Sequence, residues 1–209
     1  APAISGRDQR YLGTFGRAVT IVSAPDPLLV VGEPAARSTT WAGGAIHVYP
    51  VRADGTFGTP RTIHQGSDGV PGAPELGDEM GAALASSGSM LLVGLPGENV
   101  GSLVDAGSFL ALRFTGGTAF TATGYSQNTT GVRDTAETGD RFGASVALDG
   151  NHGAVGAPNE ALGTKSKAGL VQPFVISDGV LGFSAAISQD SPGVPGGVES
   201  GDRFGASVE

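Results

Sequence analysis

Hydrophobic and polar positions alternate with a period of two along many short segments of the chain, and the 3.6-residue period of a helix is not evident anywhere. Along one such segment Phe142 and Val146 point to one face, whereas Gly143 and Ser145 point to the other. One face is therefore bulky and the other small, which suits sheets stacked face to face. Bounded by glycine, proline, aspartate or asparagine, the strands predicted here lie at about 142–148, 153–158, 168–176 and 182–189.

This pattern recurs at a spacing of 62 residues. The octapeptide Gly-Asp-Arg-Phe-Gly-Ala-Ser-Val at 139–146 returns unchanged at 201–208, and a related form begins at Gly77. The tripeptide Gly-Ala-Pro that begins at Gly156 has counterparts that begin at Gly94 and Gly32. A fixed period of this length indicates a repeat architecture, and four short strands per copy are typical of the blade of a β-propeller.

We therefore predict an all-β fold of four-stranded antiparallel propeller blades, in one domain that spans 1–209. Three copies are complete and a fourth has begun when the sequence stops. Propellers usually close with four to eight blades, and three blades alone would leave two apolar faces uncovered. We expect a seven-bladed ring, of which the chain is a fragment, or a ring completed by another copy or a partner chain. The expected bounds are about 13–76, 77–138 and 139–200 for the three blades and 201–209 for the start of the fourth.

Phe142-Gly143 followed by Gly156-Ala157-Pro158 resembles the FG-GAP repeat, the blade unit of the integrin α-subunit propeller and of many secreted bacterial proteins. The likeness extends in phase over three copies, from Phe15 to Val208. In that family seven blades usually close a ring that binds proteins or glycans. The resemblance therefore implies a binding or adhesion module.

Many members of that family also carry an Asp-x-Asp-x-Asp-Gly calcium loop between the first two strands of a blade. Here that connection is 85–89 in the second copy and 149–151 in the third, and neither offers enough carboxylates to hold Ca²⁺. We expect these loops to be plain turns, with Asp149-Gly150 as a tight-hairpin dipeptide. Neither a metal ion nor a cofactor is expected.

Composition narrows the classes of partner. The 209 residues include 12 Lys+Arg against 20 Asp+Glu, a net charge of −8, and no cysteine. The acidic balance argues against a basic stripe that could bind nucleic acid. Without cysteine, neither disulfides nor cysteine chemistry is possible. No apolar run in the sequence is long enough to span a bilayer. The 36 glycines and 13 prolines are explained by turns at fixed places in the repeat. Because the start Ala1-Pro2-Ala3 is of the kind that signal-peptide cleavage leaves, we expect a secreted, extracellular protein.

The residues that could carry chemistry do not form a recognisable catalytic pattern. His47, His64 and His152 fall at unrelated positions of the repeat, unlike the converging ligands of a zinc site. A nucleophile elbow and a phosphate-binding loop are both missing from the sequence. The Glu-x-Gly-Asp loops, such as Glu137 to Asp140, have two interpretations: the aspartate accepts a backbone N–H in the turn, or the carboxylates share a cation. We favour the first.

The long loops offer the best candidates for a binding site. In an up-and-down blade the loop from strand two to strand three shares an end with the loop into the next blade, and loops on a rigid scaffold often carry binding residues. An exposed Trp41 could stack on a sugar or anchor a protein contact; the alternative is that it covers the blade edge as core. Seven residues of this rim, which we interpret as differing between copies, are the candidate ligand-binding residues: Trp41, Arg37, Glu98, Asn99, Arg133, Lys165 and Lys167.

The sequence thus predicts a secreted, non-catalytic binding or adhesion module. Its partner would be a protein or a carbohydrate, the module being lectin-like in the second case. The alternative is the propeller domain of a secreted hydrolase or other enzyme whose catalytic residues lie outside this segment. A third possibility is a purely architectural subunit.

Overall fold

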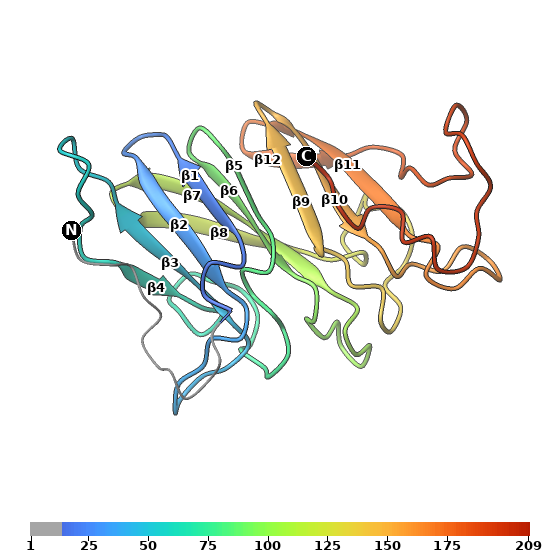
Figure 1. Ribbon diagram of the computed structural model, residues 1–209, viewed down its shortest axis with the longest axis horizontal. Helices are drawn as coiled ribbons and strands as arrows, with labels where there is room; N and C mark the ends of the chain where they lie inside the picture. Colours follow the sequence, from blue (N-terminus) through green and yellow to red (C-terminus); the bar gives the residue numbers. More distant parts are fainter. Residues whose placement is uncertain (1–13) are drawn as a thin grey trace.

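The computed structural model describes residues 14–209, so the Ala1-Pro2-Ala3 start lies outside the described residues. All regular structure in the described part is β, in three four-stranded sheets (Figure 1). The first contains β1 (Val19–Val22), β2 (Leu28–Glu33), β3 (Ala45–Pro50) and β4 (Arg61–Ile63). The second contains β5 (Leu84–Ser87), β6 (Met90–Leu95), β7 (Ser108–Gly116) and β8 (Ala119–Tyr125). The third contains β9 (Ser145–Asp149), β10 (His152–Ala157), β11 (Leu170–Ser177) and β12 (Val180–Phe183).

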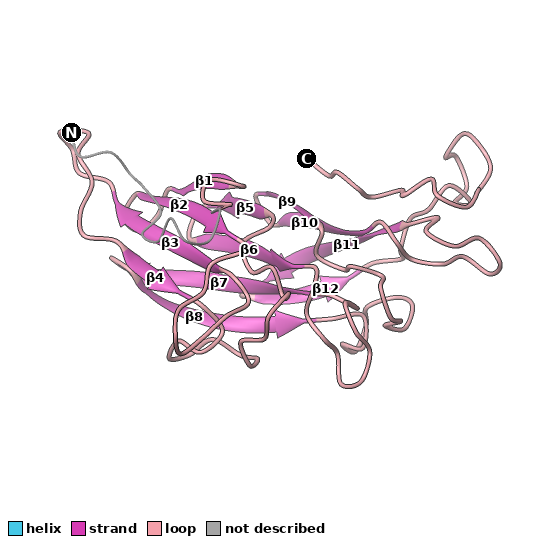
Figure 2. Ribbon diagram, turned by 60° about the horizontal axis from the view of Figure 1, so that its bottom comes forward, coloured by secondary structure: helices cyan, strands magenta, loops and turns pink. Residues whose placement is uncertain are grey.

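Each sheet is an antiparallel meander in which every strand pairs with the next along the chain. The sheets stand side by side in chain order, with the second between the first and the third (Figures 1 and 2). Their first strands are neighbours: β5 contacts both β1 and β9, and the hydroxyls of Thr20 and Ser86 lie 2.8 Å apart. Propeller blades are arranged around their axis in this way. The predicted all-β fold class is therefore confirmed, and each sheet is called a blade below.

Both faces of the middle blade are buried. On β6, Leu91 and Val93 belong to the apolar cluster shared with the first blade, whereas Leu92 belongs to the cluster shared with the third. Because neighbouring residues of a strand point to opposite faces, a blade packed on both sides needs an unbroken apolar run. Figure 2 shows the resulting stack.

The bulky face of the third blade packs on small residues of the second. Phe142 and Val146 share a buried cluster with Ala83 and Ala85, which precede and follow the start of β5. On the other face of β9, the Ser145 hydroxyl donates to the carbonyl of Gly205 at 2.8 Å. The asymmetry expected from the sequence therefore sets which face meets which neighbour.

Two glycines of the repeated motif bring consecutive blades into backbone contact. The N–H of Gly143 donates to the carbonyl of Gly156 in its own blade at 3.0 Å. The carbonyl of Gly143 points at Gly94 in the preceding blade, where an added Cβ would lie 2.1 Å from the oxygen. The same close approach recurs where Gly32 meets Gly81 and where Gly156 meets Gly205. The motif is glycine-rich because the main chains of adjacent blades touch there.

The connection between the first two strands is a two-residue turn in the second and third blades. Gly88 and Gly150 take the first position of these turns, each with φ +57°. In the third blade the flanking residues Asp149 and His152 form the last pair of the ladder. These connections are tight hairpins, as expected.

The last strand of the third blade differs from the predicted 182–189. β12 ends at Phe183 because Pro173 on β11 has no N–H for the neighbouring strand. The buried side chain of Gln172 instead donates through Nε2 to the carbonyl of Ser184 at 2.8 Å. The N–H of Ser184 still donates to the carbonyl of Pro173 at 3.0 Å, and a reciprocal pair of backbone bonds returns at Ile187, which exchanges two 2.8 Å hydrogen bonds with Val171.

The first strand of that blade also begins later than predicted, at Ser145 and not at 142. Phe142 forms a parallel bridge with Gly107 of the preceding blade, so this part of the chain serves the junction between blades. Phe204 bridges Gly169 in the same way. The beginning of the fourth copy therefore meets the third blade as the third meets the second.

The long loops gather at one end of the blades. The N–H of Gly139, in the loop between the second and third blades, donates to the carbonyl of Val104 in the β6–β7 loop at 2.9 Å. Gly201 and Ser166 repeat this bond at 3.0 Å. The two kinds of long loop thus share one end, which we call the long-loop end. Over residues 14–209 there is no helix with the length and apolar character needed to cross a membrane.

Candidate functional site

The Glu-x-Gly-Asp loops are turns in which the aspartate caps the backbone. Asp78 Oδ2 accepts the N–H of Glu75 at 2.6 Å, and Asp140 Oδ2 accepts that of Glu137 at 2.5 Å. A third copy of the bond joins the corresponding residues at 199 and 202 at 2.7 Å. The favoured interpretation, in which the aspartate accepts a backbone N–H in the turn, is confirmed. This hydrogen bond uses one carboxylate oxygen of each aspartate.

A buried glutamine reaches from each loop between blades to a glutamate of the next blade. Gln65 Nε2 donates to Glu98 Oε2 at 2.6 Å, and Gln127 Nε2 donates to Glu160 Oε2. Burial raises the pKa of Glu98 to about 7, despite the hydrogen bond from Gln65. Burial also raises the pKa of Asp78 to about 6. Both groups can therefore hold a proton near neutral pH.

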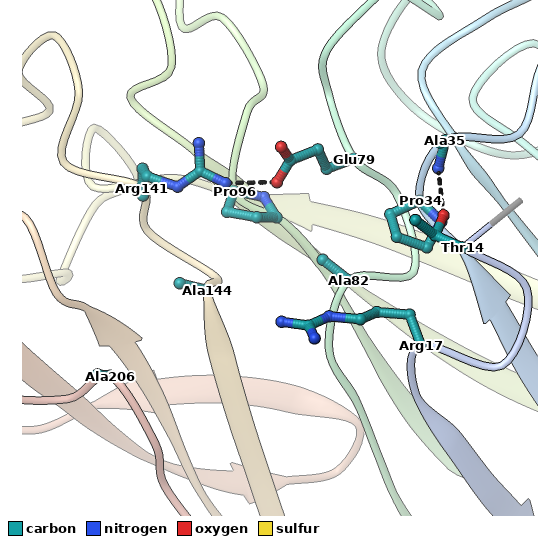
Figure 3. Close-up of a pocket in the computed structure, with 10 residues that line it drawn as sticks. All are labelled: Thr14, Arg17, Pro34, Ala35, Glu79, Ala82, Pro96, Arg141, Ala144 and Ala206. Carbon is teal, nitrogen blue, oxygen red and sulfur yellow. Dashed lines mark hydrogen bonds and ion pairs between the residues drawn. The ribbon is translucent and has the colours of Figure 1, made fainter. Parts of the chain in front are cut away.

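A central hollow of about 460 Å³ opens at the long-loop end (Figure 3). Its floor is made of small residues at the same repeat position, Ala82, Ala144 and Ala206. The charged side chains in it are Arg17, Glu79 and Arg141, of which Arg141 donates to Glu79. Figure 3 shows the Arg17 side chain extending into the hollow, and among residues 14–209 it has no ion-pair partner within 4.0 Å. Within the described residues, Arg17 is thus a cation without an ionic partner in a hollow that proline and alanine side chains also line.

A second hollow, of about 300 Å³, lies between the first two blades at the same end. Glu98 and Asn99 line it together with Tyr125. Asn99 Nδ2 donates to Glu75 Oε2 at 2.8 Å, so this candidate residue also stabilises the junction. Of the seven predicted candidates, these two share one hollow.

Trp41 stacks on His64, with ring centroids 4.1 Å apart and planes 9° apart. The indole is half-buried, and burial lowers the pKa of His64, which favours the neutral imidazole. One face of the indole therefore covers the first blade, while part of the ring stays accessible. The position combines both interpretations of this residue.

The remaining candidates are exposed and dispersed. Arg37 lies in the β2–β3 loop, Arg133 between the second and third blades, and Lys165 and Lys167 in the β10–β11 loop. Arg133 is fixed through its backbone N–H, which Gln172 Oε1 accepts at 2.9 Å. The structure does not bring these four side chains together in either hollow.

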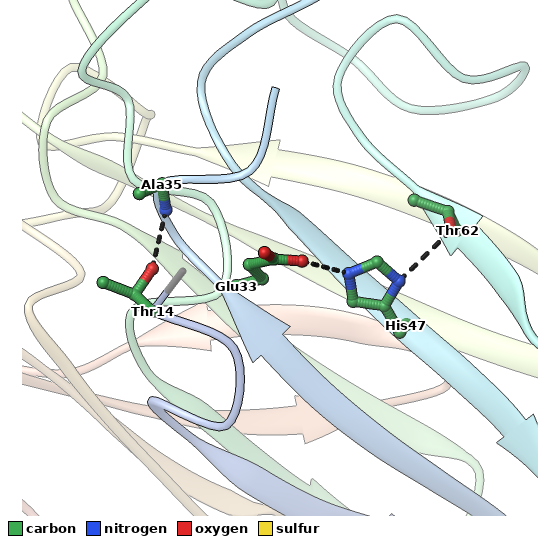
Figure 4. A network of polar contacts seen from close by, with 5 residues as sticks. All are labelled: Thr14, Glu33, Ala35, His47 and Thr62. Atoms are coloured by element: carbon green, nitrogen blue, oxygen red, sulfur yellow. Dashed lines mark hydrogen bonds and ion pairs between the residues drawn. The ribbon is translucent and has the colours of Figure 1, made fainter. Parts of the chain in front are cut away.

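A polar network specific to the first blade occupies positions that are apolar in the other copies (Figure 4). His47 Nε2 lies 2.8 Å from Glu33 Oε2, and Nδ1 lies 3.2 Å from Thr62 Oγ1. Since a carboxylate only accepts hydrogen bonds, Nε2 carries the proton in this pair. Nearby, Thr14 Oγ1 accepts the N–H of Ala35 at 2.9 Å. The network fixes β2 against β3.

Sequence reasoning missed two features of the long-loop end. Arg17 and Arg141 were not among the candidates, because the hollow that they line requires the spatial arrangement of three blades. The second feature left a signal: Glu98 recurs as Glu160 at the repeat spacing, in step with the glutamines. Glu98 was interpreted as differing between copies, but in the second and third blades it belongs to the shared scaffold.

The fold and these contacts define a class of protein, β-propeller blades joined through glycine backbone contacts. Residues 133–172 match the family model of the FG-GAP repeat, so the resemblance of this part of the chain to that repeat is confirmed. The match covers β9, β10 and the glycines at 143 and 156. No curated protein matches the chain.

Proposed function

We propose that the chain is a secreted, non-catalytic binding module with integrin-α-like blades, and that it recognises a protein or glycan through the long-loop end. The observation that carries this proposal is the difference between the two ends. The long-loop end holds hollows of about 460 and 300 Å³, whereas the opposite end of the second and third blades consists of two-residue turns. Concave surfaces with a few polar groups are the usual ligand sites.

The central hollow fits a ligand that carries an anionic or strongly hydrogen-bonding group. Arg17 offers a planar donor set that matches a carboxylate or sulfate, and Glu79 can accept from a hydroxyl. Trp41, farther out along the same end, adds a half-buried aromatic surface. A protein side chain and an acidic glycan both present this chemistry.

Closure of the ring belongs to the same proposal. Val175 and Ile187 on the far side of the third blade are 37% and 38% exposed. They occupy a face that a following blade would cover, as the third blade covers the second. Further blades, another copy or a partner chain would bury this surface and complete the central hollow.

A glycan array and a screen against cell-surface proteins test the proposal directly. We expect binding by the intact protein that weakens at least about tenfold, or 1.4 kcal/mol, in Arg17→Ala or Trp41→Ala without loss of folding. Arg52→Ala is the matched control, because Arg52 lies in the β3–β4 loop at the opposite end. Silence of the intact protein on both screens, or equal loss in the control, would overturn the proposal.

A further inference from the structure

Three carboxylates converge at the junction between the second and third blades. Glu137 and Asp140 come from the loop before β9, and Glu160 comes from the loop after β10. One oxygen of each lies within 4.8 Å of the others. Asp140 and Glu160 are 2% and 1% exposed, so two of the three carboxyl groups lie inside the protein. Glu137 is exposed and leaves the cluster open to solvent on one side.

A buried amide oxygen lies beside this cluster. Gln127 is 2% exposed, and its Nε2 donates to Glu160. Because Oε1 is bonded to the same amide carbon, it lies near the Glu160 carboxylate, and no described residue donates to it; Oε1 of the corresponding Gln65 and Gln189 is likewise without a donor. An unsatisfied buried acceptor is costly. The site thus offers a fourth oxygen that lacks a positive partner.

The charges at this junction are not balanced by any basic side chain among the described residues. Asp134 adds a further carboxylate close enough to raise the pKa values of Asp140 and Glu160. Within residues 14–209, neither lysine nor arginine forms an ion pair with any of these four acids. Buried carboxylates are usually neutralised by a proton, a paired cation or a metal ion.

The preceding junction contains the same parts but balances them differently. There Asn99 donates to Glu75 at 2.8 Å, which satisfies the carboxylate that corresponds to Glu137. At the position of Asn99 the third blade has Ala161, which cannot donate through its side chain. The later junction therefore lacks the amide that occupies Glu75 in the earlier one, and it alone in residues 14–209 has three acids converging.

We propose that Glu137, Asp140, Glu160 and the Oε1 of Gln127 form a binding site for a hard divalent cation, Ca²⁺ or Mg²⁺. Four oxygen ligands with carboxylate charge suit these ions, and water completes the coordination from the exposed side at Glu137. Ca²⁺ bonds of 2.3–2.6 Å allow ligand oxygens about 4.6–5.2 Å apart, which accommodates the observed separation. The site lies at the long-loop end, away from the hairpin at Gly150, and it would tie the loop between blades to the β10–β11 loop.

Calorimetric titration of the full chain, stripped with EDTA, tests this site with CaCl₂ and, separately, MgCl₂. We expect one ion per chain and a rise in the thermal midpoint on addition of the ion that binds. Glu137→Gln should weaken that affinity at least tenfold, and it should fold normally because Glu137 is exposed. Glu75→Gln is the matched control in the preceding junction and should bind as the unchanged protein does.

A second variant tests the comparison between the junctions. Ala161→Asn places an amide where Asn99 stands in the preceding blade, so it should donate to Glu137 and weaken cation binding without removing a carboxylate. Absence of binding to both ions at millimolar concentration would overturn the proposal. Unchanged affinity in both Glu137→Gln and Ala161→Asn, or equal weakening in Glu75→Gln, would also overturn it, since the ion would then lie elsewhere.

Discussion

Gly94 on β6 lies directly against the backbone carbonyl of Gly143 in the next blade, where a Cβ would come within 2.1 Å of the oxygen. Any side chain here must push two main chains apart. We expect Gly94→Ala to lower the free energy of unfolding by about 1–3 kcal/mol, the usual range for overpacking. Urea denaturation followed by circular dichroism measures this change.

Gly197 provides the control for this substitution. A Cβ at Gly197 would meet no atom within 4 Å, and its φ is not in the left-handed region. Gly197→Ala should leave the stability almost unchanged. Equal stability of the two variants would show that the blades separate at Gly94 without cost.

The pair of Glu33 and His47 should behave as a unit. His47→Phe introduces the residue found at the corresponding position 109, but it leaves the Glu33 carboxylate without its partner. We expect a loss of about 1–3 kcal/mol in the free energy of unfolding. The double variant Glu33→Leu with His47→Phe reproduces the pair of the second blade and should recover most of that loss. Simple additivity in this double-mutant cycle would contradict the coupling.

Gln172 should stabilise the outer strand of the third blade. Gln172→Leu removes the amide that bonds the Ser184 carbonyl and the Arg133 N–H, with an expected loss of about 0.5–1.5 kcal/mol for each bond. Amide hydrogen exchange at Ile187 should accelerate, because the irregular segment before it loses its support. Adding Pro173→Ala restores a backbone donor and should reverse part of both effects; no reversal would mean that Pro173 is not the cause.

In the absence of a bound cation, stability should fall as the pH rises. Burial raises the pKa of Glu160 from 4.5 to about 8 and that of Glu98 to about 7. The folded state therefore binds more protons than the unfolded state between about pH 4.5 and 8, and the free energy of unfolding decreases across that window. Thermal midpoints measured in EDTA from pH 5 to 8.5 would show this decline, because that range spans the folded-state pKa values of both glutamates.

Glu160→Gln isolates the contribution of the more strongly shifted group. An amide does not titrate, so the upper part of the decline, from about pH 7 to 8, should flatten in this variant. Glu98→Gln should make the decline shallower only below about pH 7, where Glu160 still contributes to the slope. A pH profile that neither substitution alters would place the responsible groups elsewhere.

The repeat predicted the blades because its spacing depends on residues that the backbone contacts require, such as Gly94, Gly143 and Gly156. The same reasoning failed at the last strand of the third blade, where Pro173 removes one backbone donor and Gln172 replaces it. The repeat spacing does not reveal that a side-chain amide replaces a backbone N–H at one position. The central hollow was missed for a different reason: Arg17 and Arg141 are far apart in sequence, and only the packing of blades brings them to one cavity.

The candidate rim was predicted in outline, since the long loops do share one end. Its individual residues were harder to place, because Glu98 and Asn99 are held by Gln65 and Glu75 in a junction whose existence depends on two different blades. The position of a residue in the repeat shows which residues correspond in different blades, but it does not show which residues are in contact.

Besides the apolar clusters, consecutive blades meet through a main-chain contact that recurs with the repeat, that of Gly143 with Gly94. Some long-loop side chains, such as Glu98 and Asn99, also hold the junction, but the exposed Lys165 and Lys167 form no side-chain hydrogen bond or ion pair with another described residue. Substitutions at such exposed positions can accumulate, and recognition of new ligands can arise, while the contact between blades stays the same. The architecture separates the part of the sequence that must be inherited intact from the part that is free to specialise.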